Sequence, residues 1–226
     1  KTFQVGQRVC YTTYAQAGSF AQKIAIHERY VIPIPDEITD EYAVTMFKAL
    51  TAHMLLFRTY SIKKQDVLCV AGATGGVATY MSQWCKQIGI SIVGLCRNPE
   101  EKAMAMENGC SKVFTYDEEK NCIEYTKSIS RGKAGVNAFF DGIGIKAYPL
   151  GIKSLAPFGL YVNYGDASGI IKGMSAKHFE RKALFFTSPS VFYSKANSVE
   201  LALTTDLIFH GMKEGFLKPN LLRYNF

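Results

Sequence analysis

A glycine-rich turn is the part of this sequence best suited to chemistry. The segment AGATGGVA, residues 71–78, follows a continuous apolar run and precedes a helical stripe. Gly72 permits a tight turn, and Gly75 and Gly76 let backbone N–H groups approach a pyrophosphate because no Cβ stands in the way. The dipole of the following helix favours an anion there. The spacing is G-x-x-G-x-x-A, so the turn could be a mere connector, but its strand–turn–helix context favours nucleotide binding.

The end of the next expected strand bears on the choice of nucleotide. Units that bind NAD place Asp or Glu there, where it holds the ribose 2′-hydroxyl. Here Arg97 occupies that place, and Lys102 follows within about one helical turn. A guanidinium suits a 2′-phosphate, which predicts NADPH, whereas the alternative is a solvated arginine at a strand end. We interpret Glu100 and Glu101 as residues that stabilise the first turn of the next helix.

Other catalytic and metal-binding patterns are absent from the sequence. It contains no G-x-S-x-G elbow, no H-E-x-x-H and no Walker lysine. The four histidines are isolated, which favours structural or surface roles, so no catalytic residue is assigned. No two cysteines are spaced C-x-x-C and none pairs with a nearby histidine, which predicts that there is no metal site. The six cysteines are Cys10, Cys69, Cys85, Cys96, Cys110 and Cys122. Several lie in apolar patterns, which is typical of a reducing compartment and predicts a cytoplasmic protein.

Strand and helix patterns alternate around the turn. Strands are expected at residues 66–71, 90–95, 112–115, 136–141, 160–165 and 183–188. Helices are expected at residues 77–88, 118–129 and 145–154, and another from Asn98 as N-cap, with Pro99 at the first helical position, to Gly109. This alternation predicts the α/β class, with a Rossmann-type doubly wound parallel sheet covered by helices on both faces.

The two ends of the chain do not follow this repeat. The first 35 residues predict short strands, one around Val9 and Tyr11 and others at Phe20, 23–26 and 30–34. One or two helices are expected after Asp36, where an acidic start precedes apolar residues at helical spacing. Near the C-terminal end, Ser198 is expected to cap a helix that runs to about Met212.

Composition limits the possible partners. The net charge is +7, from 26 Lys and Arg and 19 Asp and Glu, and it favours anionic partners. The basic residues are scattered, however, with no run longer than two, which indicates a solvated surface. No apolar run approaches the roughly 18 residues of a membrane span, so the sequence excludes a transmembrane protein. The first ten residues lack the apolar core of a signal peptide, and the chain does not begin with Met.

Several segments resemble, in order along the chain, the zeta-crystallin-like quinone oxidoreductases of the medium-chain dehydrogenase/reductase superfamily. These segments are GQRV, GSFAQ, DEITDEYAVTMFKALTAHMLLFRTYSIKKQD, AGATGGVA, QWCKQIG, SKVFTY, YVNYGDASG and FFTSPS. The resemblance implies a Rossmann domain that binds NADPH, a split GroES-like β-rich catalytic domain, and a homodimer. It divides the chain into part of the GroES-like domain (1–45), the Rossmann domain (46–192) and a return to the catalytic domain (193–226). Compared with the family, the chain begins inside the catalytic domain and stops before the closing C-terminal segment.

The resemblance also implies which residues bind the cofactor. The pyrophosphate would be cradled by Thr74, Gly75, Gly76 and Val77. The adenosine and its 2′-phosphate would lie near Arg97, Lys102 and Tyr116, and the nicotinamide near Tyr164 and Gly165. Thr51 and the stretch 187–190, including Thr187, would line the cofactor cleft.

The same resemblance bears on zinc and on the reaction. Zinc-dependent relatives insert a four-cysteine lobe after the strand matching GQRV, where only CYTTYAQA separates Val9 from Gly18. They also place a ligand cysteine in the stretch matching MFKALTAH, which has none. Without zinc to polarise an alcohol or aldehyde, the predicted hydride acceptor is already electrophilic, a quinone or an α,β-unsaturated carbonyl. The alternative is a non-catalytic nucleotide-binding protein that binds RNA or has a structural role, although no RNA-recognition motif supports it.

Overall fold

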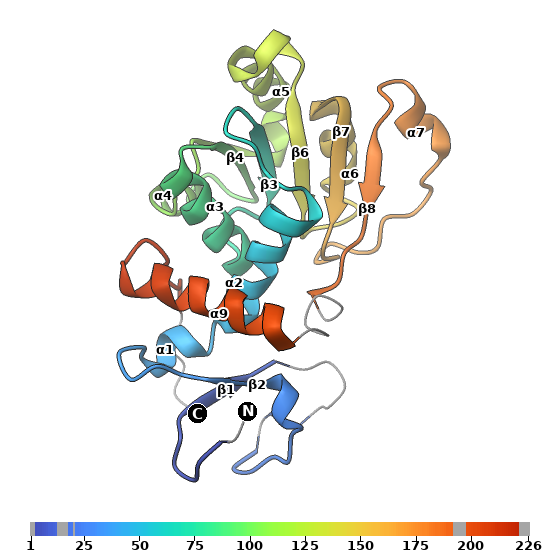
Figure 1. Cartoon of the computed structure of the whole chain (residues 1–226). Helices are drawn as coiled ribbons and strands as arrows, with labels where there is room; N and C mark the ends of the chain where they lie inside the picture. Colours follow the sequence, from blue (N-terminus) through green and yellow to red (C-terminus); the bar gives the residue numbers. More distant parts are fainter. Residues whose placement is uncertain (1–2, 13–17, 20, 192–197, 222–226) are drawn as a thin grey trace.

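A six-stranded parallel sheet forms the centre of the computed structural model, which describes residues 3–12, 18–19, 21–191 and 198–221 (Figure 1). Its strands are β3 (Val67–Ala71), β4 (Ser91–Cys96), β5 (Lys112–Thr115), β6 (Val136–Asp141), β7 (Leu155–Asn163) and β8 (Phe185–Thr187). They lie in the order β5-β4-β3-β6-β7-β8, and all pairings are parallel. The strand order reverses between β3 and β6, as in a doubly wound dinucleotide-binding fold, so the predicted fold class is confirmed.

Helices cover both faces of the sheet. One face carries α2 (Met46–His53), α3 (Gly76–Ile88), α4 (Glu101–Glu107) and α9 (Ser198–Lys213). The other carries α5 (Glu119–Ile129), α6 (Tyr148–Ser154) and α7 (Ala176–Glu180). Short elements connect or precede them: α1 (Asp40–Ala43), the π-helical η2 (Met54–Thr59), and the 3-10 turns η1 (Glu28–Tyr30), η3 (Tyr116–Glu118) and η4 (Arg131–Lys133).

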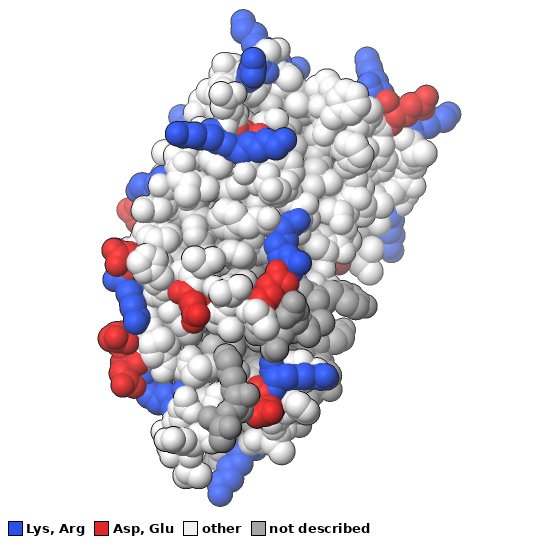
Figure 2. Space-filling model, viewed as in Figure 1, with Lys and Arg blue, Asp and Glu red and all other residues white. Residues whose placement is uncertain are grey.

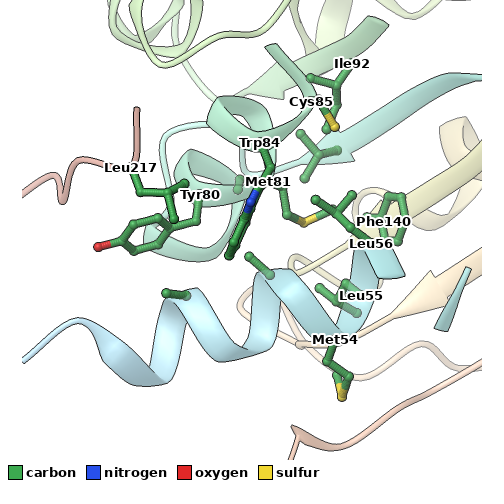
Figure 3. Packing of buried hydrophobic residues seen from close by; sticks show 14 of the residues in the cluster. Met54, Leu55, Leu56, Tyr80, Met81, Trp84, Cys85, Ile92, Phe140 and Leu217 are labelled. Atoms are coloured by element: carbon green, nitrogen blue, oxygen red, sulfur yellow. The ribbon is translucent and has the colours of Figure 1, made fainter. Parts of the chain in front are cut away.

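The alternation of side chains along β3 explains the two-sided core. All five residues of this strand are buried, because successive side chains point to opposite faces. Leu68 and Val70 pack on the α2–α3 side, and Val67, Cys69 and Ala71 pack on the α5–α6 side. Figure 3 shows the first side from close by, where side chains of α3 such as Met81 and Trp84 lie between that helix and α2 with η2, near Leu55.

The N-terminal segment differs from the prediction. β1 (Val9–Tyr11) pairs antiparallel with β2 (Val31–Pro33), so the expected strands around Val9 and within residues 30–34 form one two-stranded ribbon. Residues 23–26 are irregular and largely exposed rather than a strand. The expected strand at Phe20 and the capping side chain of Ser198 lie outside the described residues. The boundaries at 45 and 192 between the three predicted parts stay predictions.

The start of α4 is also corrected. The helix begins at Glu101, so Asn98 is not its N-cap and Pro99 is not its first residue. Residues 97–100 instead form a turn, in which the Glu101 N–H donates to the Asn98 carbonyl (3.2 Å). The carboxylate of Glu101 accepts from the N–H of Arg97 (3.1 Å), at the start of this turn.

A close helix–sheet contact makes the fold sensitive to one added methyl group. Gly151 of α6 faces the sheet, where a Cβ would lie 2.4 Å from the ring of Tyr161 and 2.8 Å from that of Phe139. Both rings are fully buried, and overpacking of this kind costs about 1–3 kcal/mol. We therefore expect Gly151→Ala to lower the free energy of unfolding by about 1–2 kcal/mol, despite the better helix propensity of alanine. Urea unfolding followed by circular dichroism measures this, and unchanged stability would contradict the packing described.

Candidate functional site

A cleft of about 400 Å³ opens at the carboxyl edge of the sheet, beside the ends of the paired strands β3 and β6, where the strand order reverses. Ligands of open α/β sheets bind at such switch points, because the loops after the two strands run to opposite faces. The cleft is lined by Lys48 of α2, the turn residues Ala71, Gly72, Thr74, Gly75, Gly76, Val77 and Ala78, Arg97 and Glu101 after β4, Tyr116 after β5, Gly142 and Ile143 after β6, and Tyr164 and Ala167 after β7. Seven of the residues predicted to bind a cofactor are in this group.

The glycine turn presents uncapped backbone N–H groups to the cleft. Gly72 has a positive φ of 76°, which favours glycine, and the Gly75 N–H donates to the Gly72 carbonyl (2.8 Å) to close the turn. Gly75 is the N-cap of α3 and offers no side-chain oxygen. The N–H groups of the first helical turn, from Gly76 to Ala78, therefore lack intrahelical acceptors, and the helix dipole adds positive potential. This arrangement can bind a phosphate or diphosphate.

Tyr116 braces the turn from the neighbouring loop. The Gly72 N–H donates to two acceptors, the Leu95 carbonyl (2.9 Å) and the Tyr116 Oη (3.2 Å). Burial raises the pKa of the Tyr116 phenol far above its ordinary value, so the hydroxyl stays protonated at neutral pH. It can accept from the turn and still donate to a ligand.

The basic residues after β4 are arranged differently from the prediction. The guanidinium of Arg97 lies at the cleft, largely exposed, with its Nη2 3.4 Å from the Glu101 carboxylate. Lys102 does not line the cleft, because its Nζ pairs with Glu118 at 2.5 Å. Glu118 also accepts from the Thr115 N–H (2.8 Å) at the end of β5. The lysine therefore holds the β5–η3 corner together, and Glu101 takes the place beside Arg97.

The opposite wall of the cleft depends on a buried carboxylate. Asp141 ends β6 with no exposed surface; its Oδ1 accepts from the N–H groups of Ile143 (2.7 Å) and Gly144 (2.9 Å), and its Oδ2 from the Tyr161 hydroxyl (2.6 Å). Burial raises the pKa of this carboxyl, while these hydrogen bonds favour its charged form. The loop they shape brings Gly142 beneath Tyr164, where a Cβ on the glycine would lie 2.9 Å from the tyrosine ring.

Three other residues that were predicted to bind the cofactor do not line the cleft. Thr51 is buried one turn after Lys48 in α2, and its hydroxyl donates to the Phe47 carbonyl (2.8 Å). Gly165 packs against the backbone of Gly142, where a Cβ would meet the carbonyl oxygen at 2.9 Å. Thr187 ends β8 opposite Val162 of β7.

Sequence reasoning missed Lys48, Glu101, Gly142, Ile143 and Ala167 as lining residues. The Asp-Gly pair that ends the strand 136–141 was a usable signal, because carboxyl ends of parallel strands share one edge. No local pattern marks Lys48, whose side chain stem would lie 3.3 Å from a Cβ at Gly76 although it belongs to an earlier helix.

Within the described residues, no three His, Cys, Asp or Glu side chains gather in a group that could hold a metal ion. All six cysteines are free thiols, and five of them are buried. None of the described helices is both long and apolar enough to cross a membrane.

Comparison with known proteins decides the family. A sequence model described as zinc-binding dehydrogenase matches residues 76–204, more than half of the chain. The chain belongs to this family. The family's description mentions zinc, but the described residues of this chain contain no group of His, Cys, Asp or Glu side chains that could hold a zinc ion.

Relatives of this family member point to one subgroup. It is 27% identical over 218 residues to a quinone oxidoreductase of Pseudomonas aeruginosa, covering 96% of this chain and 66% of the relative. A 2-haloacrylate reductase of a Burkholderia species is 27% identical, with 98% and 67% covered. The crystal structure of Escherichia coli quinone oxidoreductase complexed with NADPH superposes with a TM-score of 0.91 at 27% identity, covering 98% of this chain and 68% of that one. The resemblance to quinone oxidoreductases of the medium-chain superfamily is thus confirmed, and the chain spans about two thirds of the length of these relatives.

The Lys102–Glu118 pair predicts a pH-dependent contribution to stability. The lysine and the Thr115 N–H lower the pKa of Glu118 to about 2 from 4.5. Because the folded-state pKa is depressed, the stabilisation is complete above about pH 4.5 and is lost as the pH falls toward 2. We expect Glu118→Gln to lower the free energy of unfolding by about 1 kcal/mol at pH 7, and the difference from wild type to shrink at pH 3.

Urea unfolding at both pH values measures this difference. Glu124→Gln is the matched control, because its carboxylate is mostly exposed and lies 4.0 Å from Lys120. We expect the control to change stability by less than about 0.5 kcal/mol at either pH. An equal effect of the two substitutions would contradict a specific role for Glu118.

Proposed function

We propose that this chain binds NADPH and carries the cofactor-binding part of a zinc-independent reductase, which transfers a hydride to a quinone or another α,β-unsaturated carbonyl compound. The observation that carries the proposal is the uncapped start of α3, which faces a cleft at the switch point of the sheet. The names of the relatives support the acceptor class, since one reduces quinones and another a haloacrylate, a conjugated acid.

The lining residues fit such a cofactor. The N–H groups of Gly76 and Val77 would hold the diphosphate, and Thr74 would add a hydroxyl from the same turn. The guanidinium of Arg97 would meet the 2′-phosphate at the far side of the turn, and Tyr116 would lie between the two. When bound, NADPH supplies the hydride of the reaction.

At the other end of the cleft, residues of the chain would place and shield the nicotinamide. Tyr164 and Gly142 close the cleft from the β6–β7 side, and the carbonyl of Asp141 accepts from the Tyr164 N–H (2.8 Å) to fix that wall. Burial raises the pKa of the Tyr164 phenol far above its ordinary value, so its hydroxyl remains a hydrogen-bond donor at neutral pH.

The wider setting follows the same proposal. Zinc is not needed, because a quinone or enone is electrophilic without a Lewis acid and the described residues offer no donor set for the metal. Six free thiols favour a reducing compartment, which supports a cytoplasmic location. The alternative, a protein that binds RNA, finds little support, since Figure 2 shows Lys and Arg spread over this face, several beside Asp or Glu.

Cofactor binding can be tested without an acceptor. We expect NADPH to quench the fluorescence of Trp84, a residue of α3 that packs against α2 and η2, or to raise the melting temperature of the chain. Gly142→Ala would displace the Tyr164 ring from its place in the cleft and weaken NADPH binding by about tenfold or more. The control is Lys120→Ala on the exposed side of α5, which should leave the dissociation constant unchanged. Failure of the wild-type chain to bind NADPH at millimolar concentration would refute the proposal.

A homodimer is the expected assembly. β8 forms the edge of the sheet, and Phe185 on it exposes 58% of its surface. An apolar edge strand needs cover, and a second copy that continues the sheet provides it. We expect the chain to sediment as a dimer at micromolar concentration and Phe185→Asp to sediment as a folded monomer. A monomeric wild type would count against this assembly.

A further inference from the structure

A carboxylate lies in the cleft where the 2′ position of a bound dinucleotide is expected. Glu101 lines the cleft together with Arg97, at the carboxyl end of β4. Its Oε2 accepts from the Arg97 N–H (3.1 Å), and its Oε1 lies 3.4 Å from the Arg97 guanidinium. The side chain of Glu101 is 24% exposed and that of Arg97 is 79% exposed, so the acid is the more firmly placed of the two.

Lys102, the next residue along the chain, does not compensate for this acid inside the cleft. The ammonium of Lys102 is turned toward the β5–η3 corner, where Glu118 takes it at 2.5 Å. Among the described residues that line the cleft, Arg97 and Glu101 carry the charges after β4 and are already paired with each other, while Lys48 lies beside Gly76. A ribose 2′-phosphate, which is anionic, must draw Arg97 away from its partner and approach the remaining negative charge.

We propose that Glu101 is a selectivity residue that weakens the preference of this cleft for NADPH and allows NADH to bind as well. This inference rests on the proposed cofactor-binding function. The hydroxyl at the 2′ position of NADH can donate to the Glu101 Oε1, whose contact with Arg97 is long and leaves acceptor capacity. Arg97 then favours NADPH, because it attracts the 2′-phosphate. Glu101 favours NADH, because it accepts a hydrogen bond from the 2′-hydroxyl and repels the phosphate.

The test is the ratio of two dissociation constants, that for NADH divided by that for NADPH. We expect a ratio below about ten for the wild type, and a ratio about tenfold larger for Glu101→Gln, because the loss of one charge-assisted interaction changes affinity by at least about that factor. Glutamine can still accept from the Arg97 N–H, so the turn at 97–100 keeps its hydrogen bond. The titration follows fluorescence at constant ionic strength.

Glu107→Gln is the matched control. It removes the same charge from the same helix at an exposed position, six residues or roughly 9 Å further along the axis. We expect its ratio to stay within twofold of the wild type, because solvent and salt screen charges over about 8 Å at physiological ionic strength. Equal changes in the two variants would assign the effect to overall charge and overturn the proposal.

Further measurements separate electrostatics from shape and this inference from the proposed function. The gain in Glu101→Gln should shrink as salt is raised from 0.05 to 0.5 M, at roughly the ionic strengths where the screening length falls from above 10 Å toward 3 Å. A gain that is independent of salt, an unchanged ratio or a smaller ratio would each overturn the role of Glu101 while leaving NADPH binding intact. A wild-type chain that binds neither dinucleotide would overturn both proposals.

Discussion

The buried carboxylate of Asp141 is the interaction on which the shape of the cleft depends. A charged group with no exposed surface is costly unless its hydrogen-bonding capacity is filled, and here two backbone N–H groups and the Tyr161 hydroxyl fill it. These bonds tie the loop after β6 to the middle of β7. The same tyrosine ring packs against Phe139 and lies over Gly151, so the loop, the sheet and α6 are held as one unit.

The two walls of the cleft are built on different principles. On the β3 side the backbone itself is the binding surface, since the glycine turn brings the first N–H groups of α3, from Gly76 to Ala78, to the cleft without intrahelical acceptors. On the β6 side the backbone N–H groups are consumed by Asp141, and glycine serves only to admit the Tyr164 ring. A polar, anion-accepting wall thus faces an aromatic one across the point where the strand order reverses, which suits a ligand with a charged linker and a flat ring.

The sheet and its turn could be predicted from the sequence because they rest on local patterns. Continuous apolar runs such as 66–71 indicate strands buried on both faces, and the glycines within residues 72–78 indicate a tight turn. The prediction of strand 23–26 was wrong, because these residues are largely exposed and irregular in the described part of the chain, and apolar residues alone do not specify a strand. The pairing of Lys102 with Glu118 could not be predicted from the sequence, because the direction of the lysine side chain depends on the residue at which α4 begins. The capping pattern at Asn98 predicted the wrong first residue for this helix. Lys48 was missed because its helix joins the cleft only through tertiary packing.

The turn of residues 97–100 makes loop length a means of changing ligand choice. Successive residues of an α-helix are rotated by roughly 100°, so Glu101 and Lys102 project in different directions from the same first turn of α4. Removal of one residue from this turn, with α4 kept in place, would bring a lysine to the position of the acid. The local charge would then invert without any substitution. In this fold, therefore, insertions and deletions at the end of the second Rossmann strand can alter cofactor recognition as strongly as point mutations.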